Sequence, residues 1–369
     1  MRILQVVPRF PPQLCGVGDQ SWLLGETMFR DHGIVSRFLV SSPEWLPQPA
    51  TDPQLVTALH RQSDSALDLQ LAHESKDISG LLIHYSGYGY AKRGAPLWLA
   101  RAARRFSKNH PGIPLHVMFH ELSSRGSWRS SSFWNWPLQQ WIVSRLTRLA
   151  SGTVFTNRED YARQIRAWLP KQTTPVQTLP VFSNLGEPEQ LPAWETREQA
   201  MAFFGWPIPS SIASQFFQRL RTTIITLGVK KLHVFRHPLP TGFELPIPVE
   251  THQVLPPDSI SAILNTCRYA FSDYNPFYLG KSSLLATFAA HGLTTILHEG
   301  MGVLPDGIKV GQQVLSAADT ISLQNVAKFQ EVANQLQAWY RTHDRRKTAT
   351  VYADAIRHGV SILSTKPSA

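Results

Sequence analysis

Several short groups of residues carry atoms suited to chemistry on a polar ligand, and the most informative is Gly16-Val17-Gly18-Asp19. It follows an apolar run at residues 3–7 and a proline-rich turn, and it precedes a helical pattern at residues 21–30. Glycines let the backbone approach a ligand closely, and a helix N-terminus presents unpaired N–H groups with a partial positive charge. This spacing favours a phosphate or a reacting polar group there. A plain glycine turn is the alternative.

A histidine and a carboxylate stand together at His120-Glu121, directly after the apolar run at residues 115–119. A carboxylate beside an imidazole can bias its protonation, which suits the pair to catalysis. We therefore expect His120 and Glu121 to be catalytic. The alternative is a histidine that packs in a half-buried turn.

The segment at residues 85–94 (YSGYGYAKRG) combines glycines, aromatic rings and cations. Sugars and nucleotides are bound through aromatic faces and fixed hydrogen bonds, so the segment predicts an acceptor-binding loop. A tyrosine-rich surface loop is the alternative. The acceptor-binding residues expected here, together with Asp19, are Tyr85, Tyr88, Lys92 and Arg93.

A lysine and two hydroxyls open a helical pattern at Gly280-Lys281-Ser282-Ser283. Together with the free N–H groups of a helix start they suit a diphosphate. The segment is not a Walker A loop, because Asn275 stands where the first glycine should be. An ordinary serine N-cap beside a solvated lysine is the alternative. We expect Gly16, Val17, Gly18, Lys281, Ser282 and Ser283 to bind the donor.

Tryptophans and arginines alternate over residues 125–148, with Trp134 and Trp136 at the centre. Such a mixture favours a lipid-headgroup interface or an amphipathic acceptor. A helix packed on the edge of a domain explains it equally well.

A net charge of +10 predicts acidic partners, such as phosphorylated small molecules or an anionic membrane surface. No nucleic-acid motif accompanies the charge, so we expect no nucleic-acid partner. Cys15 and Cys267 are too few for a disulfide framework or a cysteine zinc site. No apolar run is long enough to span a bilayer, so we expect a cytoplasmic protein, with attachment to the inner face of the membrane left open.

No metal is predicted from the histidines. The four candidate histidines do not have a known metal-binding spacing. His233 and His237 are four residues apart, but they flank a strand instead of sharing a helix face. The four candidates are His84, His116, His233 and His237.

Apolar runs alternate with helical patterns in both halves of the chain, which predicts parallel sheets covered by helices on both faces. We expect two such α/β domains facing across a cleft, at residues 1–180 and 197–345, joined by a Pro/Gln/Glu-rich linker at 181–196. A last helix at 346–369 is expected to pack back on the first domain. Ligands of these sheets bind beyond the carboxyl ends of the strands, where Gly16, Tyr85 and His120 each follow a strand.

The sequence resembles the retaining glycosyltransferases of family 4, which have the GT-B fold. The resemblance spans nearly the whole chain. It is carried by residues 1–12 (MRILQVVPRFPP) with the glycine loop, and by 118–121 (MFHE), 254–264 (VLPPDSISAIL), 267–272 (CRYAFS) and 289–293 (AAHGL). It implies that His120 lies near the reacting sugar, where its ring can donate a hydrogen bond to a sugar hydroxyl or stabilise positive charge. It also implies a nucleotide sugar as substrate and no cofactor.

The sequence departs from the family at the donor site. The family has two glutamates seven residues apart, and alignment on His291-Gly292 places Leu279 and Thr287 there. Glu187 and Glu195 have the right separation but lie in the linker. The family's Arg/Lys pair is also missing, because Trp206-Pro207 follows Gly205 and the nearest cations are Arg219 and Arg221.

The sequence therefore predicts a glycosyltransferase that moves a sugar from a nucleotide diphosphate to a hydroxyl of a carbohydrate or lipid-linked acceptor, with retention. The alternative is a non-catalytic GT-B protein that binds a carbohydrate or a nucleotide. A scaffold at a membrane surface is a second alternative.

Overall fold

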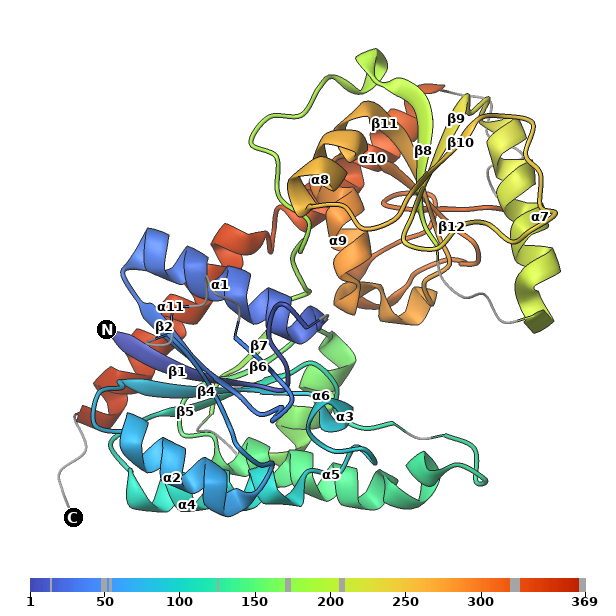
Figure 1. Cartoon of the computed structure of the whole chain (residues 1–369). Coiled ribbons are helices and arrows are strands. Elements are labelled where there is room, and N and C mark those ends of the chain that lie inside the picture. Colours follow the sequence, from blue (N-terminus) through green and yellow to red (C-terminus); the bar gives the residue numbers. More distant parts are fainter. Residues whose placement is uncertain are drawn as a thin grey trace. The chain divides into compact units, whose positions relative to one another are not determined.

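The computed structural model describes residues 1–13, 15–47, 52, 55–124, 126–169, 174–205, 210–318 and 326–364. The chain divides into two compact units (Figure 1). Unit 1 comprises Met1–Pro180 with Arg345–Ala369, and unit 2 comprises Val181–Asp344. Of the residues singled out above, Arg125, Trp206 and Pro207 lie outside the described ranges.

Unit 1 is built on a parallel sheet of seven strands in the order β3-β2-β1-β4-β5-β6-β7. Its central strands β4 and β5 are buried along their length and rich in aliphatic residues, because both faces of such a sheet are covered. The strands are β1 (Arg2–Val7), β2 (Val35–Val40), β3 (Val56–Ala58), β4 (Gly80–Tyr85), β5 (Leu115–Phe119), β6 (Val154–Thr156) and β7 (Val176–Thr178).

Helices cover both faces of this sheet, with α1 and α11 together on one face and α2, α4 and α5 on the other (Figure 1). The last helix follows unit 2 in sequence, yet the ring of its Tyr352 stacks on Phe155 at 3.9 Å. The helices of unit 1 are α1 (Gly16–His32), α2 (Asp64–Glu74), α3 (Gly87–Tyr90), α4 (Leu97–Asn109), α5 (Ser131–Leu149), α6 (Glu159–Trp168) and α11 (Arg345–Ser364).

Unit 2 contains a second parallel sheet, of six strands in the order β10-β9-β8-β11-β12-β13. Apolar residues of α7 and α10 pack on one face, and those of α8 and α9 on the other. Its strands are β8 (Glu198–Phe204), β9 (Lys231–Phe235), β10 (Val249–His252), β11 (Cys267–Ser272), β12 (Thr294–Leu297) and β13 (Leu315–Ser316). Its helices are α7 (Ser210–Thr226), α8 (Pro257–Thr266), α9 (Ser283–Ala290) and α10 (Val326–Tyr340), with short 3-10 turns η1 (Trp194–Thr196), η2 (Pro276–Lys281) and η3 (Pro305–Gly307).

The predicted fold class, two parallel-sheet α/β domains, is confirmed. The structure differs locally. Helix α1 begins at Gly16, well before the predicted start at residue 21, so the glycine segment is the first turn of the helix and not a loop. Strand β10 was not predicted, because it lies at the sheet edge with mostly exposed residues and has no apolar run.

Candidate functional site

The strands of unit 1 end at an edge where α1 begins. Gly18 lies against the loop that follows β1, because a Cβ there would meet the Arg9 carbonyl oxygen at 2.4 Å. A Cβ on Gly16 would meet nothing within 4 Å. Gly18 is therefore required for close packing of α1 on this loop. Gly16 and Val17 carry first-turn N–H groups that make the helix start suitable for an anion.

A chain of buried polar side chains crosses the sheet toward the same edge. The Nε2 amide group of Gln5 donates to the Ser36 hydroxyl at 2.8 Å, so the Gln5 carbonyl oxygen faces His84. That oxygen lies 2.7 Å from Nε2 of His84. Nδ1 of His84 lies 3.2 Å from Nε2 of His120. Each member of the chain is thereby joined to the next by one hydrogen bond.

This chain fixes the proton positions of both histidines. Burial lowers the pKa of His84 well below its ordinary value, with the neighbouring His120 lowering it further, so the His84 ring is neutral. Its one proton sits on Nε2, because the Gln5 oxygen can only accept. Nδ1 of His84 then accepts from Nε2–H of His120. In its neutral form His120 therefore presents Nδ1 as a hydrogen-bond acceptor.

The backbone holds His120 at the end of β5. Its N–H donates to the Tyr85 carbonyl at 2.9 Å, and its carbonyl accepts from the Asn157 side chain at 3.4 Å. The side chain is buried, with 7% of the residue exposed. Glu121, expected to set the protonation of His120, is half-buried and adds to the rise in the Tyr85 pKa that burial causes. His84 contacts the His120 ring at 3.2 Å, a pairing that the sequence analysis does not predict.

The expected acceptor-binding residues separate into two groups. Tyr85 is fully buried at the end of β4 and packs in the apolar core, which corrects its expected role at the acceptor surface. All side chains of β4 are covered, so this aromatic ring has no exposed face. Tyr88, Lys92 and Arg93 are exposed on and after the short helix α3, and Asp19 is half-buried in α1.

The loop after α3 depends on glycine. Gly94 has φ +71°, and a Cβ there would meet the Gln139 amide at 2.7 Å. That amide donates to the Arg93 carbonyl at 3.1 Å, which holds the loop on α5. The structure thus gives the exposed cations of this segment a fixed backbone.

In unit 2, Lys281, Ser282 and Ser283 precede and open α9. The Ser282 hydroxyl accepts from the Leu285 N–H at 3.1 Å and is buried, so it is the helix N-cap, the alternative reading of this serine. Lys281 is half-exposed, with Nζ 5.6 Å from the centre of the Tyr278 ring. Ser283 is half-exposed at the first position of the helix.

The positions of the family's glutamates are buried. Leu279 packs in the interior, and the Thr287 hydroxyl donates to the Ser283 carbonyl and lies 3.0 Å from the Ser183 hydroxyl. Glu187 accepts a hydrogen bond from the Tyr340 hydroxyl. Leu279 and Thr287 therefore offer no carboxylate and no exposed face to a ligand.

Other charged groups follow the strands of unit 2. Asp273 comes directly after β11, and burial raises the pKa of its carboxyl group. Arg219 donates to the His298 carbonyl at 3.1 Å and to the Glu299 carboxylate at 3.0 Å, both just after β12. Asp273 is not among the site residues expected from the sequence.

The tryptophan-rich segment forms part of α5 and the loop before it. Trp128, Trp134 and Trp141 are exposed, and the Arg129 guanidinium lies 4.9 Å from the centre of the Trp128 ring. None of the helices in the described ranges combines the length and the apolar character that a bilayer crossing requires.

No model of a known protein family and no characterised protein matches the sequence. Solved structures do resemble this one. MnaA of S. aureus in complex with UDP matches with a TM-score of 0.61 and 11% identity, over 100% of this chain and 99% of the other. A Listeria monocytogenes protein assigned as a UDP-N-acetylglucosamine 2-epimerase matches with a TM-score of 0.60 and 10% identity, over 99% and 97% of the two chains.

An α-glucosyltransferase in complex with UDP-glucose and DNA containing an abasic site also matches, with a TM-score of 0.57 and 11% identity, over 99% of this chain and 100% of the other. These likenesses extend over both units. Together with the two parallel-sheet units, they establish the GT-B fold for this chain.

Proposed function

We propose that this chain is a glycosyltransferase that moves a sugar from a nucleotide-diphosphate donor to a hydroxyl acceptor, with retention at the anomeric carbon. Two of the proteins that share its fold were solved with UDP or UDP-glucose. The observation that carries the proposal is the Gln5–His84–His120 chain, which orients a buried histidine at the carboxyl edge of a parallel sheet. Ligands of such sheets bind at this edge.

The reaction breaks the bond between the anomeric carbon and the diphosphate oxygen and forms a bond from that carbon to the acceptor oxygen. The acceptor proton leaves with the nucleoside diphosphate. In this proposal the imidazole of His120 contacts a hydroxyl of the sugar and fixes its position. The acceptor surface is formed by Asp19, Tyr88, Lys92 and Arg93. The N–H groups in the first turn of α1 stabilise negative charge that develops beside the sugar.

The departing diphosphate needs positive charge around it. Lys281 and the N–H groups at the start of α9 supply it in this proposal, with the Ser283 hydroxyl as a further donor. Ser282 acts indirectly, by capping the helix that presents these groups. They take the place of the Arg/Lys pair that the family resemblance implies.

UDP binding tests the donor site. Lys281→Met removes the charge and keeps the side-chain length, so calorimetry should show UDP affinity reduced about 10-fold. Lys230→Met is the matched control, because Lys230 is exposed and directly precedes β9. It therefore lies at the amino end of this strand, away from the carboxyl ends where ligands bind. If the unaltered protein binds no nucleoside diphosphate, the proposal fails.

Turnover of UDP-sugars tests the role of His120. His120→Asn should lower the rate about 100-fold while leaving UDP affinity unchanged. His73→Ala, an exposed histidine on α2, is the control. Equal rates for His120→Asn and the unaltered protein would remove His120 from the chemistry.

Two other functions have specific support. The structural similarity to the Listeria protein named above favours an epimerase. The buried, uncharged Leu279 and Thr287, at the positions of the family's glutamates, favour a binding protein without catalysis. NMR of the sugar separates the three: a new glycosidic bond identifies the transferase, a changed configuration without acceptor identifies the epimerase, and an unchanged bound ligand identifies the binding protein.

The exposed tryptophans bear on the class of acceptor. We propose a carbohydrate or lipid-linked acceptor, and Trp134 on α5 would contact an anionic membrane that carries it. Binding to anionic liposomes should be lost in a Trp134→Ala, Trp136→Ala variant and kept in Lys281→Met. Liposome binding by that double variant would assign the tryptophans to packing alone.

A further inference from the structure

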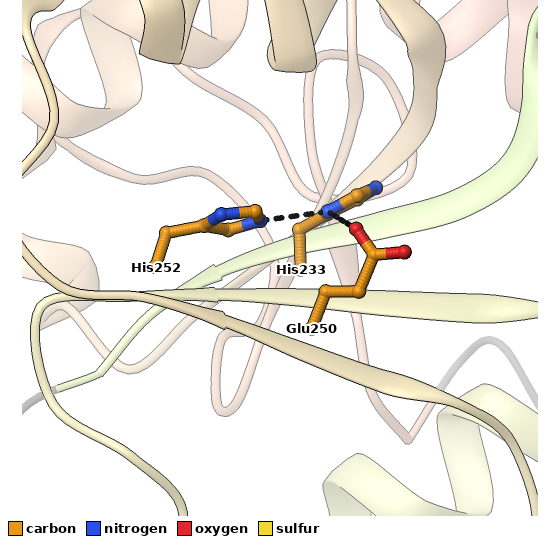
Figure 2. A group of neighbouring side chains, drawn as sticks. All are labelled: His233, Glu250 and His252. Atoms are coloured by element: carbon orange, nitrogen blue, oxygen red, sulfur yellow. Dashed lines mark hydrogen bonds and ion pairs between the residues drawn. The ribbon is translucent and has the colours of Figure 1, made fainter.

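We propose that unit 2 contains a binding site for a divalent transition-metal ion of the zinc class, formed by His233, Glu250 and His252. These residues lie on β9 and β10, two adjacent parallel strands at the edge of the sheet. Glu250 pairs with His233 across the strands. Since side chains alternate along a strand, His252 is on the same face as Glu250. Figure 2 shows the three side chains converging.

The distances between the three side chains fit shared coordination. Nδ1 of His233 lies 3.0 Å from Nε2 of His252 and 3.4 Å from the nearer Glu250 carboxylate oxygen. One ligand atom from each residue lies within 4.8 Å of the others. Donors about 2.0–2.1 Å from a tetrahedral zinc ion are separated by about 3.3 Å. The three atoms therefore need only small movements to surround one ion.

The protonation states suit a cation. Burial lowers the pKa of His233, which favours the neutral imidazole that binds metal. A hydrogen bond from Lys231 lowers the pKa of Glu250 and keeps it ionised. Glu198 also faces Lys231, at 3.7 Å. The carboxylates of Glu250 and Glu198 outnumber the single ammonium of Lys231 beside the proposed site.

Neighbouring groups orient the ligands. Lys231 holds one oxygen of Glu250 at 3.1 Å, while the other oxygen faces His233. The ring of His252 stacks at 5.0 Å on Phe235. Such surrounding contacts fix the direction of metal ligands.

The burial of the ligands shows how an ion would reach them. The His233 side chain is 6% exposed, while that of Glu250 is 48% exposed, and His252 is half-exposed on the edge strand. Two imidazoles and one carboxylate with solvent on one side are typical of zinc sites that keep a position for water. The site depends on neither the sugar donor nor the acceptor.

Calorimetry with Zn²⁺ and visible absorption with Co²⁺ test the site on the full chain after treatment with a chelator. We expect one ion per chain, a Co²⁺ spectrum of nitrogen and oxygen ligands, and a raised Tm with zinc. His252→Ala and Glu250→Gln should each lower the affinity more than about 100-fold. His237→Ala, another histidine of unit 2 and exposed, should bind as the unaltered protein does.

Glu250 is exposed and His252 half-exposed on an edge strand, and circular dichroism with a thermal melt verifies that the variants fold. The proposal is overturned if the unaltered protein binds neither ion. It is equally overturned if His252→Ala and Glu250→Gln retain full affinity. Neither readout depends on glycosyl transfer, so a failure here leaves the proposed function standing.

Discussion

Nδ1 of His84 lies 3.2 Å from Nε2 of His120, and the two rings are nearly parallel, with an angle of 25° between their planes. The contact joins neighbouring strands β4 and β5. Because His84 is neutral and anchored by Gln5, it can only accept the His120 proton. A residue in the interior of the sheet thus determines which nitrogen of His120 binds the proton.

Replacing His84 should impair turnover more than binding. His84→Phe keeps an aromatic ring of similar size but removes the acceptor for His120, so we expect turnover of a UDP-sugar to fall about 100-fold with unchanged UDP affinity. It also leaves the Gln5 oxygen without its partner, which should cost about 1–3 kcal/mol of stability. Steady-state kinetics and calorimetry measure these effects. Unchanged turnover would show that the His84 contact has no catalytic role.

Gly18 and Gly16 form a matched pair for testing the start of α1. Gly18→Ala places a methyl group 2.4 Å from the Arg9 carbonyl oxygen, and the backbone must move. We expect a loss of about 1–3 kcal/mol in the free energy of unfolding. Gly16→Ala, with nothing within 4 Å, should stay within about 0.5 kcal/mol of the unaltered protein. Urea denaturation distinguishes them, and equal stabilities would contradict the close packing.

The pH dependence of stability should reflect His116. Burial lowers the pKa of this histidine from 6.5 to about 4. Between these values the unfolded chain binds a proton that the folded chain does not. The free energy of unfolding therefore falls as the pH drops through this range, by about 3 kcal/mol from this residue.

A His116→Gln variant isolates that contribution. The glutamine oxygen can accept from the Thr153 N–H as Nδ1 of His116 does at 2.9 Å, but it does not titrate. Urea denaturation at pH 7 and at pH 5 should show a smaller loss of stability on acidification than in the unaltered protein. Identical losses would assign the acid sensitivity to other groups, such as His291, whose pKa burial also lowers to about 4.

Ser282 and Ser283 should have different roles although they are adjacent. Ser282→Ala removes the N-cap of α9 and should cost about 1 kcal/mol of stability. Ser283→Ala should leave stability nearly unchanged and weaken UDP binding, because in the proposed function its half-exposed hydroxyl donates to the diphosphate. A stability loss confined to Ser283→Ala would reverse this assignment.

Where apolar residues recur with a helix or strand period, the sequence was sufficient to predict the elements. Helix α8 was predicted with its observed bounds at residues 257–266, and the predicted strand at 269–272 forms most of β11. Such patterns have one stable solution, a covered sheet with helices on both faces.

The sequence was insufficient where tertiary contacts determine the start of a helix or the position of a side chain. Glycines weaken a helix locally, yet Gly16 and Gly18 begin α1 because the loop after β1 leaves no room for a side chain at Gly18. The sequence predicts that Tyr85 belongs to an acceptor-binding loop, whereas in the structure it is a core residue. The His233–Glu250–His252 cluster was missed because its ligands meet only through pairing of β9 with β10, an exposed edge strand that the sequence does not reveal.

The course of the chain through the two units sets what a truncated protein can do. Unit 2 is one continuous segment, whereas unit 1 is completed only when α11 has been synthesised. A fragment ending at residue 180 would lack Tyr352 and expose the ring of Phe155 to water. Translation must therefore pass α11 before unit 1 has its finished core, and termination before this helix should yield aggregation-prone material.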